Sequence, residues 1–453
     1  MVPERTWAAP RMSNPTDVLP LEPLHRFHSY CARFPSEIVE SAIRQFTAPG
    51  DSIYDPFCGS GTSLVAGLAH QRVVVGSDID VLAGMLSEVK CSPASPERYG
   101  AWRGAFAAEL ARTFEHIRAR WPPTGRRIPG RTWKVGALEL ELPRFSELNY
   151  WFPPQLTAFL AAIAAAAHRC GDPHLERVAL VSLSASIIAK WPNTLSYAMD
   201  IDHTRPHRRV QRFTSQRVLA TYLSRLDRTI DCLSALHQVY RRTGGERTLP
   251  ERWRVLCPHD ARHPSDQVPA ESQNLIVTSP PYFDAVDYPR AHRMAVCWMN
   301  GHAPAELASR RSYIGLHQNA GLAASEWLGV HPEVKRLIPE ALREGSRGRR
   351  IVGFFADLES ALAQMKRVLR PGGHAVVVIG DNTLGGHVLR SHQALVGLAR
   401  RLGFVILERK ARQIEKLRRR FPVGPFGFDG PMTHEHVLVL HKPLRSGATE
   451  GSG

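Results

Sequence analysis

The chain lacks the features that mark membrane and secreted proteins. Its longest apolar run, about residues 156–167, is much shorter than the roughly 20 residues that are needed to span a bilayer. The N-terminal segment is rich in proline, carries acidic residues and has no apolar core of the kind found in secretory signal peptides. We therefore expect a cytoplasmic protein that makes no contact with a membrane.

Cysteine pairs and metal-ligand sets are also missing from the sequence. The seven cysteines are an odd number without a Cys-X-X-Cys pair, so neither a disulfide framework nor a zinc site is expected. His434 and His436 flank a glutamate at the start of a strand-like alternation, but no third ligand is evident. We expect a structural role for these histidines and no metal in the protein.

Acidic residues are few relative to basic ones. The 453 residues include 58 Lys and Arg against 42 Asp and Glu, which gives a formal net charge of +16. Such an excess favours a polyanionic partner, through phosphate contacts and the release of counterions, although a generic basic surface is the alternative. Candidate phosphate contacts come from a basic stretch, with Arg205, Arg208, Arg209 and Arg212, and from a Gly/Ser-rich loop, with Arg347, Arg349 and Arg350.

Strand, helix and turn signals divide the chain into five segments. Residues 1–23 are typical of a flexible lead and residues 444–453 of a disordered tail. Alternating strand and helix patterns occupy residues 24–98 and 251–443, whereas residues 99–250 are rich in helix and have little strand pattern. We expect a long helix over about 215–242, and a helix over 355–369 that stops at the Arg-Pro-Gly-Gly turn of residues 370–373. The pattern predicts an α/β fold in which one sheet is interrupted by a large helical insertion.

A glycine turn follows the first predicted strand of the sheet. The strand covers residues 52–55, the turn leads into a helix over 62–70, and a buried strand at 72–77 completes a βαβ unit. Glycine backbone lets a ligand approach closely at such a turn, and the helix N-terminus favours negative charge. Nucleotide-binding turns and purely structural turns share these features.

Three carboxylates accompany the glycine turn and sharpen this prediction. Asp55 directly precedes the turn, where it could meet an ammonium group. Asp78 follows the next strand, and a carboxylate about 20 residues beyond such a turn typically accepts hydrogen bonds from ribose hydroxyls. Asp80 competes with Asp78 for this role, and Asp260 follows a third predicted strand, from which it could reach an adenine.

A second motif, Thr-Ser-Pro-Pro-Tyr, occupies residues 278–282 after a later strand. An exocyclic amine of a nucleobase is a poor nucleophile, because its lone pair is delocalised into the ring. Hydrogen bonds from the amine to Ser279 Oγ and to the Pro280 carbonyl would localise that lone pair, and the two prolines fix the backbone that presents these oxygens. Tyr282 could stack on a base that is extruded from a duplex. An ordinary turn after a strand is the alternative interpretation.

Both motifs resemble those of a known family. Asp-Pro-Phe-Cys-Gly-Ser-Gly-Thr at residues 55–62 and the motif at 278–282 resemble the cofactor and catalytic motifs of the S-adenosylmethionine-dependent DNA amino-methyltransferases, which act on N4 of cytosine or N6 of adenine. Residues 28–35 resemble the segment that precedes the glycine turn in this family, and residues 370–382 resemble its later core. The resemblance covers most of the chain outside the insertion and implies a Rossmann-like methyltransferase sheet.

The resemblance also implies the cofactor and the role of each motif residue. The cofactor would be S-adenosylmethionine, with Asp78 at its ribose and Asp260 at its adenine. The rest of its site would be lined by Tyr30, Phe34, Pro35, Asp55, Pro56, Phe57, Gly59, Gly61 and Thr62. The catalytic residues would be Ser279, Pro280, Pro281 and Tyr282, in a direct displacement on the sulfonium. No Pro-Cys pair offers a thiolate for attack on a pyrimidine ring, which argues against carbon-5 methylation.

Serine in the first position of the catalytic motif is commoner in the N4-cytosine members, whereas adenine-modifying relatives more often carry Asp or Asn there. We therefore expect a site-specific cytosine-N4 methyltransferase of a modification or defence system. Its partner would be duplex DNA with the target base flipped, and any restriction nuclease would be a separate protein. Adenine N6 methylation, tRNA or rRNA methylation and a catalytically silent nucleic-acid-binding module are the alternatives.

The element that recognises the target is left open between two segments. The insertion at 99–250 lies between the two motifs, as target-recognition segments do in the family. Asp260, however, follows the insertion, so the insertion interrupts the cofactor half itself. The loop at about 300–350 is the rival recognition element.

Overall fold

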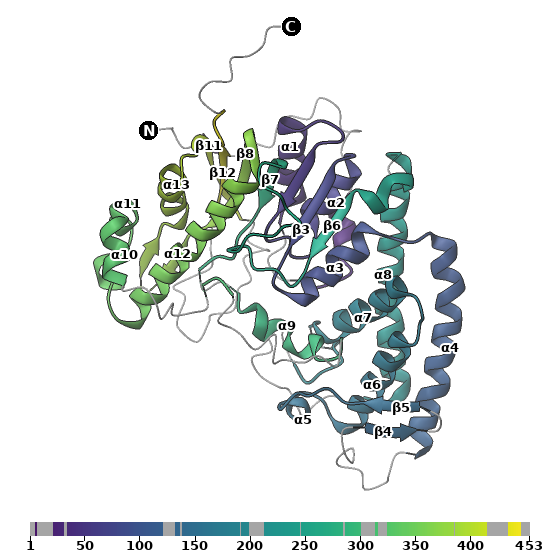
Figure 1. Cartoon of the computed structure of the whole chain (residues 1–453). Coiled ribbons are helices and arrows are strands. Elements are labelled where there is room, and N and C mark those ends of the chain that lie inside the picture. Colours follow the sequence, from purple (N-terminus) through teal and green to yellow (C-terminus); the bar gives the residue numbers. More distant parts are fainter. Residues whose placement is uncertain are drawn as a thin grey trace.

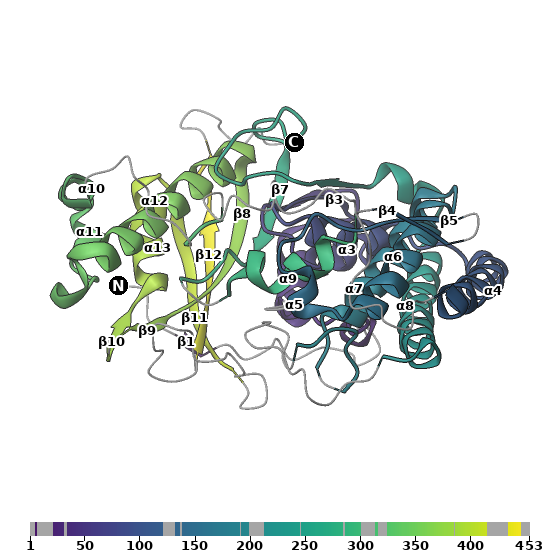
Figure 2. The ribbon, with the colours of Figure 1, turned by 90° about the horizontal axis from the view of Figure 1, so that it is seen from below.

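The computed structural model describes most of the chain (Figure 1). The described residues are 5–6, 21–30, 34–120, 132–135, 138–190, 192–198, 213–244, 246–283, 286–299, 313–315, 324–384, 386–414 and 434–444. One large sheet carries helices on both faces, and a group of long helices lies beside it (Figures 1 and 2). The predicted α/β fold with a Rossmann-like sheet is confirmed.

Eight strands form the sheet in the order β1-β11-β12-β8-β7-β2-β3-β6. Strand β12 is antiparallel to both of its neighbours, and every other pair of neighbouring strands is parallel. The bounds are β1 (Arg5–Thr6), β2 (Ser52–Asp55), β3 (Val73–Ser77), β6 (Trp253–Leu256), β7 (Gln273–Thr278), β8 (Leu369–Gly380), β11 (Val405–Gln413) and β12 (His434–His441).

The strand order changes direction at β2. The chain passes from β2 through α2 (Thr62–Ala69) to β3 on one side, whereas β7 pairs with β2 on the other side. In open α/β sheets such a change of direction leaves a crevice at the carboxyl ends of the strands, where ligands bind. The glycine turn follows β2 and the Ser-Pro-Pro-Tyr motif follows β7, so the topology brings both motifs to this crevice.

Alternate residues of the central strands enter two hydrophobic cores. In β7, Leu275 and Val277 join one core, whereas Ile276 joins the other. All six residues of β7 are buried, as expected for a central parallel strand with helices on both faces. The first core is covered by α1 (Ser36–Phe46), α2 and α3 (Val81–Cys91), and the second by α12 (Gly345–Val368) and α13 (Ser391–Arg401).

The helical segment, α4 (Pro96–Arg120) to α8 (Ser215–Arg242), packs against the helix layer formed by α1 to α3 (Figure 1). Leu233 and Tyr240 of its last helix share the hydrophobic core of that face, so the segment is continuous with the sheet domain. It also contains a short antiparallel hairpin that the sequence pattern did not predict. The elements are α4 (Pro96–Arg120), β4 (Thr132–Val135), β5 (Leu138–Glu141), α5 (Leu148–Trp151), α6 (Pro154–His168), α7 (Pro173–Ile187) and α8 (Ser215–Arg242).

The catalytic half contains further short helices and strands between the strands of the large sheet. They are α9 (Tyr288–Val296), α10 (Ala324–Val330), α11 (Pro332–Lys335), β9 (Asn382–Leu384) and β10 (His387–Leu389). None of the helices described is long and apolar enough to cross a membrane. Of the predicted flexible lead, Arg5–Thr6 forms β1 against β11 and a short 3-10 helix begins at Glu22. The rest of the lead before Leu21, and the predicted tail after Leu444, fall outside the described residues.

Two local predictions in the catalytic half are wrong. Helix α12 was expected to begin near residue 355, but it begins at Gly345, because Ile351 and Phe354 are buried at helical spacing one turn further back. Arg347, Arg349 and Arg350 therefore lie in its first two turns and not in a loop. The segment 370–373, expected as a turn that follows the helix, belongs instead to the long strand β8, with Gly372 at a positive φ of 79°.

Candidate cofactor and catalytic site

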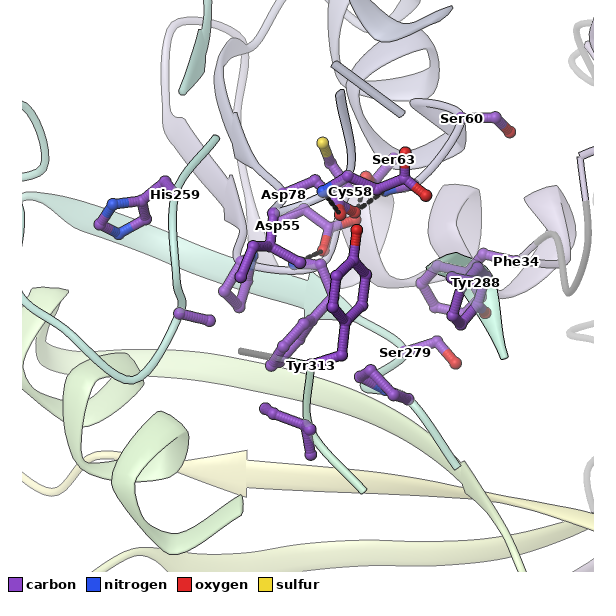
Figure 3. Close-up of a pocket in the computed structure, with 18 of the residues that line it drawn as sticks. Phe34, Asp55, Cys58, Ser60, Ser63, Asp78, His259, Ser279, Tyr288 and Tyr313 are labelled. Carbon is purple, nitrogen blue, oxygen red and sulfur yellow. Dashed lines mark hydrogen bonds between the residues drawn. The ribbon is translucent and has the colours of Figure 1, made fainter. Parts of the chain in front are cut away.

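A pocket of about 820 Å³, with its open mouth included, lies at the carboxyl ends of β2, β3, β6 and β7 (Figure 3). The predicted site residues that line it are Tyr30, Phe34, Asp55, Pro56, Phe57, Gly59, Thr62, Asp78, Asp260, Ser279 and Pro281. Pro35, Gly61, Pro280 and Tyr282 are adjacent in sequence to lining residues but do not line the pocket themselves.

Asp55 joins the glycine turn to the catalytic motif. Its carboxylate accepts hydrogen bonds from the backbone N–H of Phe57 at 3.0 Å, from Thr278 Oγ1 at 2.6 Å and from the Ser63 hydroxyl. The side chain thus holds the turn, the first turn of α2 and the end of β7 in one arrangement. Burial is the largest influence on its acidity and raises the pKa of Asp55 to about 6, although the hydrogen bonds oppose the shift.

Asp78 holds the other side of the glycine turn. Its carboxylate accepts the backbone N–H of Gly59 at 2.8 Å and that of Asp80 at 2.9 Å. Burial, and to a smaller extent the neighbouring Asp80, raise the pKa of Asp78 to about 7. The competing residue Asp80 is only 1% exposed, and its oxygens accept the Leu82 N–H at the start of α3 and pair with His292. Asp78 is therefore the more accessible carboxylate of the two.

Asp260 lies at the third strand end, beyond β6. Its carboxylate forms an ion pair with Arg262, with 2.6 Å between Oδ2 and Nη2, and Arg262 also pairs with Asp357 of α12 at 2.8 Å. Although burial opposes it, hydrogen bonding from Arg262 holds the pKa of Asp260 below its usual value. The loop that carries Asp260 is thereby fixed to the helix layer at the pocket wall.

The catalytic motif begins where β7 ends. Ser279 and Pro281 line the pocket, and Figure 3 shows Ser279 on the same side of it as Tyr288 and Phe34. Ser279 Oγ donates a hydrogen bond to the Tyr282 hydroxyl at 3.2 Å, and Tyr282 donates to Glu435 Oε1 on β12 at 3.1 Å. The motif is thus held by the glycine turn on one side and by the antiparallel strand on the other.

Further residues line the pocket that sequence reasoning did not place there. His259 comes from the segment after β6, and Tyr313 and Ile314 come from the short described segment 313–315. Tyr288, which follows the catalytic motif closely in sequence, also lines the pocket, from the start of α9. Tyr313 belongs to no recognisable motif and is remote in sequence from the motifs at residues 55–62 and 278–282, so no signal in the sequence points to it.

Of the two predicted sets of phosphate-contact arginines, the structure describes only the one on α12. Arg347 and Arg349 are exposed on α12, and the Arg350 guanidinium lies over the ring of Phe283, 5.5 Å from its centroid. Because Phe283 directly follows the catalytic motif, the first turns of α12 lie beside it. The other predicted set, Arg205, Arg208, Arg209 and Arg212, falls outside the described residues, as does most of the loop at 300–323.

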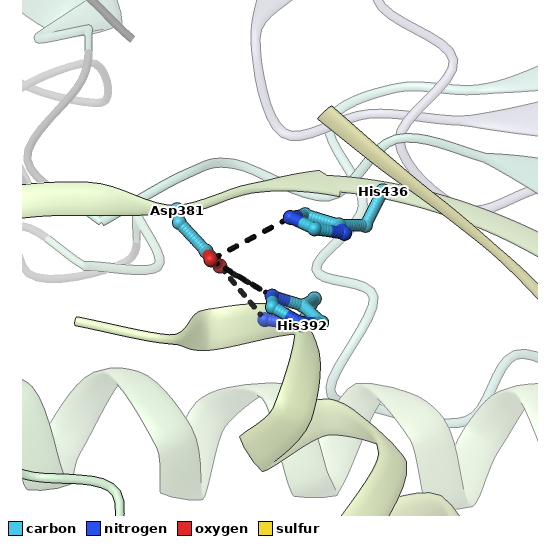
Figure 4. Close-up of side chains that lie close together, drawn as sticks. All are labelled: Asp381, His392 and His436. Atoms are coloured by element: carbon cyan, nitrogen blue, oxygen red, sulfur yellow. Dashed lines mark hydrogen bonds and ion pairs between the residues drawn. The ribbon is translucent and has the colours of Figure 1, made fainter. Parts of the chain in front are cut away.

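Asp381, His392 and His436 form a cluster where β8, α13 and β12 meet (Figure 4). Asp381 accepts a hydrogen bond from His392 Nδ1 at 2.8 Å and pairs with His436 Nε2 at 3.5 Å, and it also accepts the backbone N–H of His392. The expectation that no further ligand accompanies His436 is wrong, because one ligand atom from each side chain lies within 4.8 Å of the others.

The geometry of this cluster favours a structural role. The two imidazole rings are stacked, with 3.5 Å between centroids and 11° between planes. Two imidazoles that bind one ion must point at it from diverging directions, which parallel stacked rings do not do. Although burial opposes it, hydrogen bonds from both histidines hold the pKa of Asp381 well below its usual value. The cluster fixes the start of α13 against β8 and β12.

Gly61 is required by the backbone of the glycine turn. It has a φ of +80°, and a Cβ there would lie 2.8 Å from Ser87 Oγ and 3.1 Å from Ser87 Cα. We expect Gly61→Ala to lower the free energy of unfolding by about 1–2 kcal/mol from backbone strain alone and to weaken cofactor binding about tenfold. Thermal unfolding and calorimetric titration measure the two effects.

Gly104→Ala is the matched control for this substitution. Gly104 lies inside α4, and a Cβ there would have nothing within 4 Å. Alanine is favoured over glycine in a helix, so this variant should be as stable as the parent or more stable. Equal effects of the two substitutions would show that the turn at Gly61 tolerates a side chain.

A comparison with protein families agrees with the first motif, and relatives match further parts of the chain. Residues 2–82 match the model of a DNA methylase family of the N6/N4 amino-methyltransferase type. Type II methyltransferase M.MvaI of Kocuria varians is 22% identical over 378 residues, which cover 80% of this chain and 77% of that protein. Type II methyltransferase M.MjaI of Methanocaldococcus jannaschii is 43% identical over 49 residues, which cover 11% of this chain and 16% of that protein.

Solved structures give weaker matches. A Thermus thermophilus protein described as a DNA modification methylase, complexed with S-adenosyl-L-methionine, is 20% identical and has a TM-score of 0.23; the match covers 41% of this chain and 53% of that one. The rRNA methyltransferase aviRa of Streptomyces viridochromogenes is 12% identical with a TM-score of 0.34, over 96% of each chain.

The resemblance predicted from the two motifs is thereby confirmed. The chain is similar to the amino-methyltransferase family of DNA methylases, through residues 2–82 and through its likeness to M.MvaI. S-adenosylmethionine, the methyl donor of that family, is the cofactor.

Proposed function

We propose that the chain is a site-specific DNA methyltransferase that transfers the methyl group of S-adenosylmethionine to N4 of cytosine. The observation that carries this proposal is the hydrogen bond of 2.6 Å between Thr278 Oγ1 and Asp55 Oδ1. It joins the strand end that precedes Ser279 to the strand end that precedes the glycine turn. Two motifs that are remote in sequence therefore share one pocket, as transfer from a cofactor to a substrate requires.

The pocket fits an adenosyl cofactor. Carboxylates at three strand ends, Asp55, Asp78 and Asp260, supply acceptors for an ammonium group, ribose hydroxyls and an adenine amine. Aromatic walls come from Tyr30, Phe34 and Phe57, and the ring of Tyr30 lies so close to Gly59 that a Cβ at Gly59 would be 3.3 Å from Cε1 of Tyr30. We assign Asp78 and not Asp80 to the ribose, because the carboxylate of Asp80 pairs with His292 and accepts the Leu82 N–H at the start of α3.

The chain's own residues prepare the amine for reaction. When bound, the cofactor supplies a methyl group on a positively charged sulfur. Ser279 Oγ and the Pro280 carbonyl accept hydrogen bonds from the exocyclic amine, which localise its lone pair, and Tyr282 stacks on the flipped base. The amine nitrogen would displace S-adenosylhomocysteine from the methyl carbon as the S–C bond breaks and would then lose one proton to water, so the protein needs no nucleophile of its own. Pro280 and Pro281 restrict the backbone that presents these groups.

Cytosine is favoured over adenine by the serine that opens the catalytic motif. Adenine-N6 methylation of DNA is the second candidate, favoured by the membership of both activities in this family. The exposed Arg347 and Arg349 beside the motif, and the net charge of +16, support contact with the phosphate backbone. A modification or defence role, with any nuclease on a separate protein, and a cytoplasmic location belong to the same proposal. Target recognition is assigned to residues 99–250, with the loop at about 300–350 as the rival element.

Methyl transfer by the purified protein tests this proposal. Labelled S-adenosylmethionine is incubated with duplex DNA and, separately, with structured RNA, and the nucleosides are then separated. We expect label in N4-methylcytosine from DNA and none in the RNA. Label in RNA alone would sink the proposal, and label only in N6-methyladenine would move it to the second candidate.

A further inference from the structure

A chain of hydrogen bonds leads from Ser279 to the antiparallel strand β12. Ser279 Oγ donates to the Tyr282 hydroxyl at 3.2 Å, Tyr282 donates to Glu435 Oε1 at 3.1 Å, and Arg412 donates from Nη1 to Glu435 Oε2 at 3.0 Å. Glu435 lies directly across from Arg412 of β11 in the strand register and is 153 residues from Tyr282 in the sequence. In the sequence, Glu435 is notable only as the glutamate between His434 and His436.

The pairing of Glu435 with Arg412 determines which group donates in each of these hydrogen bonds. A carboxylate that pairs with a guanidinium can only accept hydrogen bonds, so the Tyr282 hydroxyl must donate its single hydrogen to Glu435. The Tyr282 oxygen can then only accept, so Ser279 must donate its single hydrogen to Tyr282. What Ser279 Oγ presents to a third group is a lone pair.

The strand that carries Glu435 is held on both faces. Glu435 and His436 are neighbours on β12, so their side chains point to opposite faces of the sheet. His436 pairs with Asp381 and stacks on His392 (Figure 4), while Glu435 pairs with Arg412 and Tyr282. The cluster behind the sheet thereby keeps the first residues of β12 in register with the catalytic motif.

We propose that Glu435 is a positioning residue that makes Ser279 an obligatory hydrogen-bond acceptor and so selects a base with an amino group over one with a carbonyl oxygen at the same place. This inference rests on the proposed function of Ser279. An exocyclic amine donates to the lone pair of Ser279, whereas the carbonyl oxygen of uracil or hypoxanthine is itself an acceptor and faces it unpaired. A buried polar group without a partner is the strongest basis of discrimination between such analogues.

Glu435→Gln tests the inference because it changes charge without changing shape. In this variant the carbonyl oxygen of the side-chain amide still accepts from Arg412, and the amide nitrogen donates to the Tyr282 oxygen. Tyr282 then donates its hydrogen to Ser279, so both hydrogen bonds run in the opposite direction. Ser279 now presents its hydrogen to the base. Glu408→Gln is the matched control, since Glu408 pairs with Lys410 within β11 and does not touch Tyr282.

The readout is a ratio of two affinities, measured with the full-length protein and S-adenosylhomocysteine. One duplex carries cytosine at the target position and the other uracil. The mismatch with uracil eases base flipping equally in every variant, so only the change in the ratio between variants matters. If the target proves to be adenine, hypoxanthine takes the place of uracil.

We expect Glu435→Gln to reduce the preference for the amino base about tenfold and the single-turnover methylation rate by about ten- to a hundredfold. Cofactor affinity should stay within about twofold of the parent, and Glu408→Gln should change neither quantity. A lower methylation rate with an unchanged ratio of affinities would mean that Glu435 has only a structural role and would overturn the inference. No change in the rate or in the ratio would overturn it as well. A parent protein that methylates no DNA would instead sink the proposed function, and this inference with it.

Discussion

Replacing Ser279 by alanine should lower the single-turnover rate of DNA methylation by about 10²- to 10³-fold. The substitution removes the acceptor that localises the lone pair of the exocyclic amine. Ser279 hydrogen-bonds to Tyr282, whereas the carboxylates of Asp55 and Asp78 hydrogen-bond to the glycine turn and its neighbours. The affinity for S-adenosylmethionine should therefore stay within about twofold of the parent, which calorimetric titration measures alongside the rate.

The opposite end of the same strand offers a matched control. Ser272 directly precedes β7, and its hydroxyl donates to the Pro269 carbonyl far from the pocket. Ser272→Ala removes the same atom and should leave the methylation rate unchanged. Full activity of Ser279→Ala would refute the mechanism, and a parallel loss in both variants would point to folding and not to chemistry.

The affinity for S-adenosylmethionine should rise between about pH 5.5 and pH 8, because two carboxylates of the pocket ionise in that range. Burial raises the pKa of Asp55 to about 6 and that of Asp78 to about 7. The ionised forms attract an ammonium group and accept hydrogen bonds from ribose hydroxyls more strongly than the protonated forms do. Cofactor binding should accordingly release protons, which calorimetry in buffers of different ionisation enthalpy detects.

The same two groups should affect stability in the opposite sense. Their pKa values are higher in the folded than in the unfolded protein, so the folded state binds more protons over this range. Their contribution to the free energy of unfolding is full below the ordinary pKa of an aspartate and is lost as the pH rises through about 6 to 7. Bound cofactor should offset part of this loss.

Asp78→Asn isolates the contribution of one carboxylate. It should weaken S-adenosylmethionine binding about tenfold at pH 8 and flatten the rise of affinity with pH, since one titrating group is gone. Asp266→Asn, a change of the same kind at an exposed position after β6, should leave the profile as it is. A steep pH dependence that persists in Asp78→Asn would mean that other groups govern cofactor binding.

Local patterns predicted the parts of the fold that depend on neighbours in sequence. The strand at 52–55 and the long helix at 215–242 were found where the pattern put them, because a buried alternation and an amphipathic repeat define these elements by themselves. The start of α12 was missed, because the Gly/Ser/Arg-rich segment at 345–350 has the composition of a loop. Its buried residues become visible as a helical face only once the hydrophobic core is known.

Contacts between remote residues were beyond the reach of the sequence. Asp381, His392 and His436 meet because β8, α13 and β12 pack together, and no spacing rule connects these positions. The same holds for Glu435, which reaches Tyr282 only through the pairing of β12 with β8. The two motifs could be recognised because each is continuous, whereas the groups that hold them in place are not.

The most direct test of the central claim is long-read sequencing of genomic DNA from a methylation-free host that expresses the chain, with detection that distinguishes N4-methylcytosine from N6-methyladenine. The account predicts N4-methylcytosine at one short recurring sequence, and its disappearance in a parallel strain that expresses Ser279→Ala. An unmodified genome, in a strain whose purified protein is shown to bind S-adenosylmethionine, would contradict the assignment of DNA as the substrate.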